Sequence, residues 1–213
     1  MKRFILLVFS VLFTFSVAIA QNSNFTYVPD DNFEQALIDL GIDTDSTLND
    51  SVATANIRFL PSLNVTYYSI ADLTGIEDFD SLQTLYCYGN QLTNLDVSTN
   101  TALTYLYCFS NQLTTLDVSA TTALTYLDCR YNQLTSLNLT GCTALTTLDC
   151  YSNQLTTLDV SNNTALTQLF CQSNQLTSLD LTQNTALYWL RCYNNQLTSL
   201  DLRNGNNMNM YAW

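Results

Sequence analysis

One frame of 21 residues is repeated six times without insertion or deletion. Every unit reads LxxLxCxxNQLTxL, followed by Asp or Asn and then Val or Leu. The units begin at Leu82, Leu103, Leu124, Leu145, Leu166 and Leu187. A fixed period of this length indicates a solenoid, because one unit cannot bury its apolar side alone and must stack on its neighbours. The repeat therefore determines the architecture before any single residue is considered.

Each unit is made of two half-repeats with the spacing of short strands. Leu148 and Cys150 alternate with Asp149 and Tyr151, as expected for a strand with one buried face. The second half has the same spacing, so it predicts a second short strand that directs residues such as Leu158 and Val160 at the core from the opposite side. Neither half has the room or the periodicity for a helix. We expect a mostly β, flattened solenoid of stacked parallel strands in two sheets.

An asparagine ends the first strand of every unit. Stacked asparagines can satisfy backbone groups in a tight turn that an apolar core cannot. They are Asn90, Asn111, Asn132, Asn153, Asn174 and Asn195. The equivalent place in the second half holds Asn100, Thr121, Cys142, Asn163 and Asn184.

This frame resembles the leucine-rich repeat, in particular the nested 21-residue bacterial type of secreted proteins, which reads LxxLxLxxNxLxxLDLxxN. Cys replaces the third Leu in all six units, and the resemblance covers residues 82–207. Upstream, residues 63–82 resemble an internalin-like repeat of 22 residues. Its inward positions would be Ile70, Leu73, Ile76 and Phe79.

The N-terminal part resembles the helical cap of the same family. In "YVPDDNFEQALIDLG", acids stand at the start of a helix that Gly41 can end. One helical face carries Phe33, Ala36, Leu37 and Leu40. We therefore divide the chain into a signal peptide (1–20), the cap with the first, 22-residue repeat (21–81), and the solenoid (82–213).

The end of the chain departs from the pattern. Met208, Tyr211 and Trp213 fall on the Leu, Leu and Cys positions of a truncated seventh unit. An open solenoid end exposes a sheet edge and a cross-section of the core. We expect either a fragment that lacks further repeats and a sorting domain, or an end that something else covers.

The first twenty residues have the features of a secretory signal peptide. Lys2 and Arg3 are followed by an apolar run from Phe4 to Val17 and by the small residues 18–20. The run is shorter than the ~20 residues that a membrane span needs. We expect a secreted or cell-surface protein with no membrane insertion after cleavage of the signal.

Charge and composition exclude several functions. Loss of Lys2 and Arg3 leaves four of the six basic residues against eighteen acidic ones, a net charge of −14. Such a chain is a poor partner for nucleic acid and for anionic membranes. The chain has no His, and its mature part has no Lys, which excludes His-based catalysis, His metal sites and Schiff-base chemistry. We expect no enzyme activity and no cofactor.

The cysteines of the repeats follow the same period as the leucines. They are Cys87, Cys108, Cys129, Cys150, Cys171 and Cys192. Inward positions predict a ladder of buried thiols that behave as small hydrophobes. Because neighbouring strands lie ~4.8 Å apart, bridging between coils is an alternative, and metal binding is another. Cys142 is instead a turn residue.

Acidic residues form a second ladder, which the frame places outward on the second sheet. They are Asp96, Asp117, Asp159, Asp180 and Asp201, with Asn138 in the gap. A solvated face that resists edge aggregation is the preferred interpretation. A Ca²⁺-bridged ladder and a catalytic carboxylate pair are the alternatives. The stretch "DTDSTLND" at 43–50 lacks the Gly and the closing Glu of a calcium loop, so we predict a turn and no metal.

The first sheet carries the side chains that differ between otherwise identical coils. Tyr, Trp and Arg dominate the energy of interfaces, although aromatic residues also favour exposed strands for packing alone. The candidate ligand-binding residues are Tyr86, Tyr88, Tyr105, Tyr107, Phe109, Tyr126, Asp128, Arg130, Tyr151, Phe170, Trp189, Arg191 and Tyr193. We predict recognition or adhesion through this sheet with a protein ligand, in line with the resemblance. A glycan on the same aromatics and a structural spacer without a ligand are the alternatives.

Overall fold

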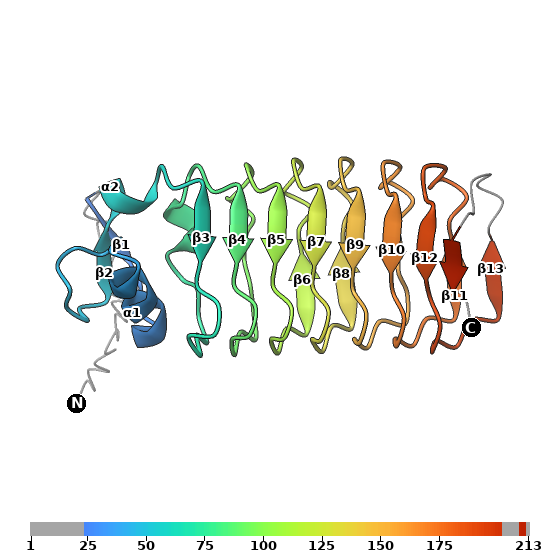
Figure 1. Ribbon diagram of the computed structural model, residues 1–213, viewed down its shortest axis with the longest axis horizontal. Coiled ribbons are helices and arrows are strands. Elements are labelled where there is room, and N and C mark those ends of the chain that lie inside the picture. The colour runs from blue at the N-terminus through green and yellow to red at the C-terminus, as the bar shows by residue number, and fades with distance from the viewer. Residues whose placement is uncertain (1–23, 202–208, 212–213) are drawn as a thin grey trace, which may run out of the picture.

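The computed structural model describes residues 24–201 and 209–211. The predicted signal peptide lies outside these residues. The chain forms an elongated solenoid in which the coils succeed one another along the long axis (Figure 1). One eight-stranded sheet, here called the first sheet, runs along it in the order β14-β12-β10-β9-β7-β5-β4-β3. The strands are β3 (Ser62–Asn64), β4 (Thr84–Tyr86), β5 (Tyr105–Tyr107), β7 (Tyr126–Asp128), β9 (Thr147–Asp149), β10 (Gln168–Phe170), β12 (Trp189–Arg191) and β14 (Asn209–Tyr211).

All strands of the first sheet are parallel, and the repeat sets their register. Leu85 pairs with Leu106, and Leu106 pairs with Leu127, one unit further along the chain each time. In the first sheet, the central leucine of each strand from β4 to β12 is at most 1% exposed, and so are the six cysteines of the repeat. Full burial of a leucine side chain stabilises the fold by ~2 kcal/mol. The predicted inward ladders of leucine and cysteine are therefore confirmed.

The second face forms short, separate sheets. β6 (Thr115–Asp117) pairs with β8 (Ser136–Asn138), and β11 (Ser178–Asp180) pairs with β13 (Ser199–Asp201). Residues 94–96 and 157–159 form no strand, so the prediction of a second strand at Leu158 and Val160 was wrong. Both side chains still point inward, at 8% and 1% exposure. The Asp that ends such a segment accepts the N–H two residues later whether or not a strand forms, as Asp159 does from Ser161 and Asp117 of β6 does from Ser119, both at 2.9 Å.

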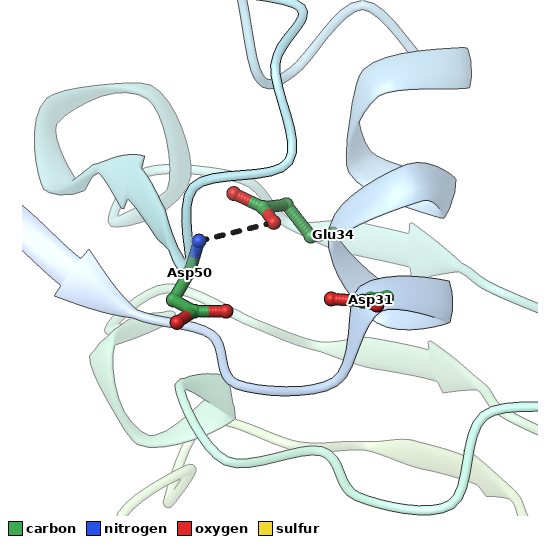
Figure 2. Close-up of side chains that lie close together, drawn as sticks. All are labelled: Asp31, Glu34 and Asp50. Atoms are coloured by element: carbon green, nitrogen blue, oxygen red, sulfur yellow. Dashed lines mark hydrogen bonds between the residues drawn. The ribbon is translucent and has the colours of Figure 1, made fainter.

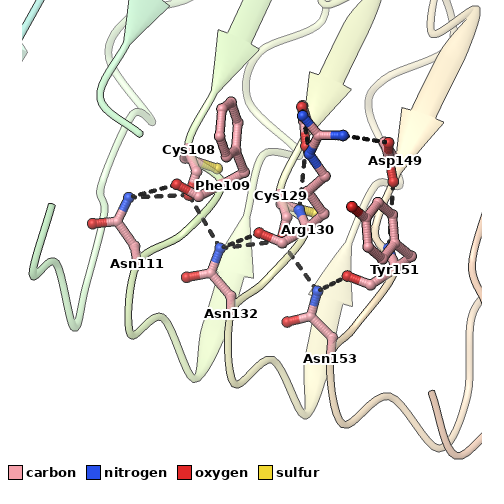
Figure 3. Close-up of polar contacts among 10 residues, drawn as sticks. Cys108, Phe109, Asn111, Cys129, Arg130, Asn132, Asp149, Tyr151 and Asn153 are labelled. Carbon is pink, nitrogen blue, oxygen red and sulfur yellow. Dashed lines mark hydrogen bonds and ion pairs between the residues drawn. The ribbon is translucent and has the colours of Figure 1, made fainter. Parts of the chain in front are cut away.

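The asparagine ladder joins neighbouring coils through the backbone (Figure 3). Asn132 Nδ2 donates to the carbonyl of Cys129 in its own coil at 3.0 Å and to that of Cys108 in the preceding coil at 3.1 Å. Its Oδ1 accepts from the N–H of Leu113 at 3.0 Å. The same pattern recurs at Asn111 and Asn153. Each asparagine thus satisfies buried backbone groups, as predicted from its position.

A second, mixed ladder lies in the opposite turns. Asn163 Nδ2 donates to the carbonyl of Leu139 at 3.2 Å, and Asn184 Nδ2 donates to that of Val160 at 2.9 Å. In the coil before that of Asn163, the thiol of Cys142 donates to the carbonyl of Val118 at 3.1 Å. Cys142 is fully buried. It therefore takes the hydrogen-bonding place of an asparagine in this turn.

The N-terminal cap covers the first coil (Figure 1). It contains β1 (Phe25–Tyr27), which is antiparallel to β2 (Ser51–Ala53), together with α1 (Asp31–Asp39) and α2 (Thr54–Ile57), while the short 3-10 helix η1 (Ile76–Asp78) belongs to the first repeat. Phe33, Ala36 and Leu37 of α1 are fully buried, whereas Leu40 is 44% exposed. The prediction for Leu40 was wrong because α1 ends at Asp39 and the chain turns away through Gly41, whose φ is +69°.

Asp30 ties the cap to the first repeat. One carboxylate oxygen accepts from the N–H of Asn32 at 2.9 Å and Phe33 at 3.0 Å, which caps α1. The other accepts from the N–H of Ala71 at 2.8 Å and Asp72 at 2.9 Å. In that repeat Ile70, Leu73, Ile76 and Phe79 are all at most 4% exposed, as predicted.

The last strand has a different register from the one that the repeat predicts. β14 pairs Met210 with Leu190, whereas the 21-residue frame places Tyr211 opposite that leucine. Met208 and Trp213, the other two predicted positions of the seventh unit, lie outside the described residues. Because β14 is the edge strand, one neighbour alone sets its register.

Candidate ligand-binding face

The candidate residues lie together along the outward side of the first sheet and the turns that follow its strands. They alternate with the buried leucines, and most of their side chains are half-buried by their neighbours. Tyr105, at 44% exposure, is the most open of them, and Asp128, at 2%, is the most buried. The outward side chains thus share one surface rich in aromatic rings, in which Asp128 is buried although its strand position faces outward.

Aromatic rings stack from coil to coil at one end of this face. The rings of Tyr86 and Tyr107 lie 4.7 Å apart and 12° from parallel. Tyr88 and Phe109 lie 4.2 Å apart and 9° from parallel. Tyr126 continues the first stack, with its ring 4.9 Å from that of Tyr107. The strand spacing of the solenoid thus imposes a ring spacing that is close to the favoured distance for stacking.

Arg130 lies at the centre of the face (Figure 3). Its guanidinium covers the ring of Phe109 at 4.6 Å and that of Tyr151 at 5.6 Å. It forms ion pairs with Asp128, at 3.3 Å from Nε to Oδ2, and with Asp149, at 3.8 Å from Nη1 to Oδ2. The two carboxylates belong to neighbouring strands and are paired in the sheet register. One cation therefore bridges two nearly buried acids.

Burial shifts the pKa values of these acids upward. It raises the pKa of Asp128 to about 7, with the negative charge of Asp149 adding to the effect and Arg130 opposing it. Burial also raises the pKa of Asp149 to about 6, against the attraction of Arg130. Burial likewise raises the pKa of the Tyr126 phenol to about 12. Near neutral pH, the charge at the centre of the face thus depends on protonation of this acid pair.

The far end of the face is built around a second arginine. The guanidinium of Arg191 lies 5.3 Å from the ring of Phe170 and 5.3 Å from that of Trp189. The two rings meet edge to face at 5.4 Å. Arginine and aromatic side chains held in such contacts lose little conformational freedom when a partner binds.

Two residues of this face were not among the predicted site residues. Tyr131 is 52% exposed, and its ring lies edge-on to that of Tyr151 at 4.8 Å. Gln172 is nearly buried, and its Oε1 has no hydrogen-bond donor among the described residues. A signal for Tyr131 was available, because the other coils place Gly, Ser or Asn in its position. Gln172 interrupts a row of aromatic residues and arginine, but only the packed structure shows that its oxygen lacks a partner.

Acidic side chains of the cap gather in one place, where Asp31, Glu34 and Asp50 lie close together (Figure 2). The oxygens of the buried Glu34 accept from the backbone N–H of Asn49 at 3.0 Å, of Asp50 at 3.2 Å and of Ser51 at 3.0 Å. Glu34 thus anchors the loop that the sequence predicts as a turn. These backbone hydrogen bonds account for the burial of the Glu34 carboxylate.

The aspartates of the second face have a nearly uniform environment. The pKa values of three carboxylates are lowered by hydrogen bonds, chiefly from a serine side chain and secondly from the backbone N–H of the same serine. The pairs are Asp96 with Ser98, Asp117 with Ser119, and Asp159 with Ser161. These carboxylates are solvent-exposed, and the side chain of Asp201 lies outside the described part. A catalytic pair requires two environments that separate the pKa values. This ladder offers the same environment at each of the three residues.

The repeats define the class of protein. The family described as leucine-rich repeats in two copies matches residues 80–121 and 122–163. A leucine-rich repeat protein of Leptospira interrogans has a structure with a TM-score of 0.57 and 28% identity, covering 61% of this chain and 36% of that one. The chain is a leucine-rich repeat protein with stacked parallel strands.

Two further comparisons are with proteins of Listeria monocytogenes. Internalin J is 42% identical over 75 residues, which is 35% of this chain and 8% of Internalin J. The solved functional domain of this internalin, described as including a cysteine ladder, is 36% identical with a TM-score of 0.48, covering 84% of this chain and 49% of that domain. This chain is a bacterial, internalin-like leucine-rich repeat protein.

The fold extends to more distant internalins. The structure of internalin C2 from L. monocytogenes has a TM-score of 0.56 at 23% identity, with 84% of this chain and 89% of that chain covered. The chain thus spans 8% of the length of Internalin J and about half of its functional domain. Internalin-like repeat proteins typically serve protein interaction or adhesion as scaffolds rather than as enzymes. In the part of the chain with described coordinates, no helix is both long and apolar enough to span a bilayer.

Proposed function

We propose that the protein is exported and binds a protein ligand through the outward face of its first sheet. The observation that carries the proposal is the continuous arrangement of stacked rings and arginines on that face, from Tyr86 to Arg191. Large, rigid side chains of this kind supply most of the energy in protein interfaces. The signal peptide predicted from residues 1–20 supports export, and the low content of basic residues disfavours nucleic acid as the partner.

The proposal is tested by capture of the ligand with the mature chain and with single variants of this face. The substitutions Tyr107→Ala, Tyr126→Ala and Trp189→Ala should each weaken binding by ~2 kcal/mol or more. The matched controls Asp117→Asn and Asp159→Asn on the second face should change the charge and leave binding unchanged. Circular dichroism and melting temperature confirm that each variant is folded.

The pattern of losses separates the alternatives. A protein ligand spreads over the face, so binding should depend on rings at both ends. A glycan that stacks on one or two rings would depend on one end only. Loss of binding in the acid variants alone would move the site to the second face and contradict the proposal. Unchanged binding in all variants would favour a structural spacer.

A further inference from the structure

A row of flat side chains runs along the edge of the first sheet, with one residue from each coil. The row consists of Tyr88, Phe109, Arg130, Tyr151, Gln172 and Tyr193. Its first four members form a continuous stack, with Tyr88 4.2 Å from Phe109, and with Arg130 4.6 Å from Phe109 and 5.6 Å from Tyr151. Gln172 interrupts the row between two tyrosines.

The interruption leaves a hollow of about 470 Å³. Gln172 lines it together with Tyr151 of the preceding coil and Tyr193 of the following coil, and Asp149 and Arg191 lie at its border. Gln172 is 5% exposed, and its buried Oε1 accepts no hydrogen bond from the described residues. An unsatisfied buried carbonyl oxygen costs ~1–3 kcal/mol. The hollow therefore combines a volume suited to a small group with an acceptor that lacks a donor.

The spacing of the coils determines which group fits. Neighbouring strands lie ~4.8 Å apart, so side chains two coils apart are separated by roughly 10 Å. A planar ring that lies over the Gln172 amide would then have Tyr151 and Tyr193 ~5 Å away on either side. This is the separation of the stacked pair Tyr86 and Tyr107, at 4.7 Å. The spacing of the two tyrosines therefore suits a planar group in the hollow.

On one side of the hollow, Tyr131 has a strained backbone conformation. Tyr131 supports Tyr151 with its ring edge-on at 4.8 Å, and its backbone φ is +52°. Bulky side chains rarely adopt this left-handed conformation. The equivalent positions in the other coils hold Gly89, Ser110, Ser152, Ser173 and Asn194. The fold thus keeps Tyr131 where a small or polar residue would be less strained, and the wall is fixed before a ligand arrives.

We propose that this hollow, here called the Gln172 slot, takes a planar aromatic side chain that carries an O–H or N–H donor, namely a tyrosine or tryptophan of a protein partner. The ring lies over the Gln172 amide, with Tyr151 and Tyr193 on either side, and a rotation of that amide brings the buried Oε1 to the donor. A guanidinium is also flat, but two arginines, Arg130 and Arg191, line the slot against one acid, Asp149, and this balance disfavours a further cation. This inference rests on the proposed function, because it assigns one anchor point within the same face.

The test uses small probes on the mature chain, so that no natural partner is needed. N-acetyl-tyrosinamide should shift the NMR signals of Tyr151 and Tyr193 on titration. N-acetyl-phenylalaninamide lacks the O–H donor. It should bind about tenfold more weakly, because it loses the affinity that one hydrogen bond contributes. Methyl glucoside should leave the same signals unchanged. Equal binding of the two amides, no shift with either amide up to its solubility limit, or binding of the sugar instead would overturn the inference.

Two substitutions separate stacking from hydrogen bonding. Gln172→Leu keeps the volume but removes the acceptor, so the affinity for the tyrosine probe should fall to that of the phenylalanine probe. Gln172→Tyr places a ring in the slot, so both probes should lose binding. The control is Gln168→Leu, the same change at the first residue of β10 in the same coil. This variant should bind both probes as the unmodified chain does. Unchanged binding in Gln172→Leu would overturn the hydrogen-bond role even if Gln172→Tyr fails to fold.

Failure of this inference and failure of the proposed function are distinguishable. If Tyr107→Ala and Tyr126→Ala lose the captured protein while Gln172→Tyr retains it, the face binds and the slot does not contribute. If the tyrosine probe binds while none of the ring variants affects capture, the slot is a small-molecule site and the proposed protein interface is wrong.

Discussion

The side chain of Arg130 forms an ion pair with Asp128, with Nε 3.3 Å from Oδ2, although both residues belong to the outward-facing set of the first sheet. Outward residues of a sheet are normally hydrated, yet Asp128 is 2% exposed. Neighbouring rings and the guanidinium cover it. The centre of this face is therefore an electrostatic cluster that is partly shielded from water, and this has measurable consequences.

The first consequence is a dependence of stability on pH. An unfolded aspartate titrates near pH 3.9, whereas burial raises the pKa of Asp128 to about 7. Between these values the folded state binds more protons than the unfolded state, so the free energy of unfolding falls as pH rises from about 4 to 7. The charged groups around Asp128 are Arg130 and Asp149, and the latter, with a pKa of about 6, acts in the same direction. The melting temperature should be higher near pH 5 than near pH 8.

Asp128→Asn tests the origin of this slope. The variant should be more stable than the unmodified chain at pH 8, by up to about 4 kcal/mol for a shift of three pKa units, and its melting temperature should vary less between pH 5 and 8. The control Asp117→Asn removes an exposed carboxylate whose pKa is lowered by hydrogen bonds from Ser119, so any stability it contributes is constant above about pH 5 and is lost only at acid pH, and the variant should keep the slope between pH 5 and 8. A melting temperature that rises from pH 5 to 8 would contradict the assignment.

Removal of the cation at the centre should destabilise the fold. Arg130→Met keeps a long side chain but leaves Asp128 and Asp149 without their ion pair. Loss of one partner of a buried ion pair costs ~3–5 kcal/mol, and protonation of the acids relieves part of it below pH 6. Urea unfolding at pH 8 and pH 5 should therefore show a larger loss at pH 8. An equal loss at both pH values would show that the arginine acts through packing alone.

The asparagine ladder predicts an effect that depends on position. Asn132→Asp replaces the Nδ2 donor to the carbonyls of Cys108 and Cys129 with an acceptor, so a buried charge would face two carbonyl oxygens. The expected loss is ~3 kcal/mol or more by urea unfolding. Asn138→Asp makes the same change at an exposed position whose Oδ1 accepts from Thr140, and it should alter stability by less than ~0.5 kcal/mol. Similar losses at both positions would argue against the ladder.

The thiols should be unreactive in the folded protein. All seven cysteines are buried and free, and burial raises the pKa of Cys87 to about 12. Because the thiolate is the reactive form, a thiol reagent should react slowly with the native chain. Denaturation without reductant should then release close to seven equivalents. A smaller number would show that some cysteines form bridges in solution.

The repeat period by itself determined most of the scaffold of this protein. A solenoid must bury the same positions in every coil, so Leu148, Cys150 and Asn153 could be assigned to the core and to the turn from spacing alone. Predictions from the local sequence pattern were wrong at two places. Leu158 and Val160 face inward without forming a strand, and Leu40 is exposed because the helix ends before it.

Tertiary structure alone decided the chemistry of the face. Alternation places Asp128 and Gln172 outward but does not reveal which neighbours cover them. Their burial depends on large side chains one coil away, brought close by the strand spacing, with Arg130 over Phe109 as one example. The raised pKa of Asp128 and the unpaired Oε1 of Gln172 follow from that packing. A local sequence pattern does not predict contacts between residues 21 positions apart. In this protein those contacts determine which polar groups are shielded from solvent.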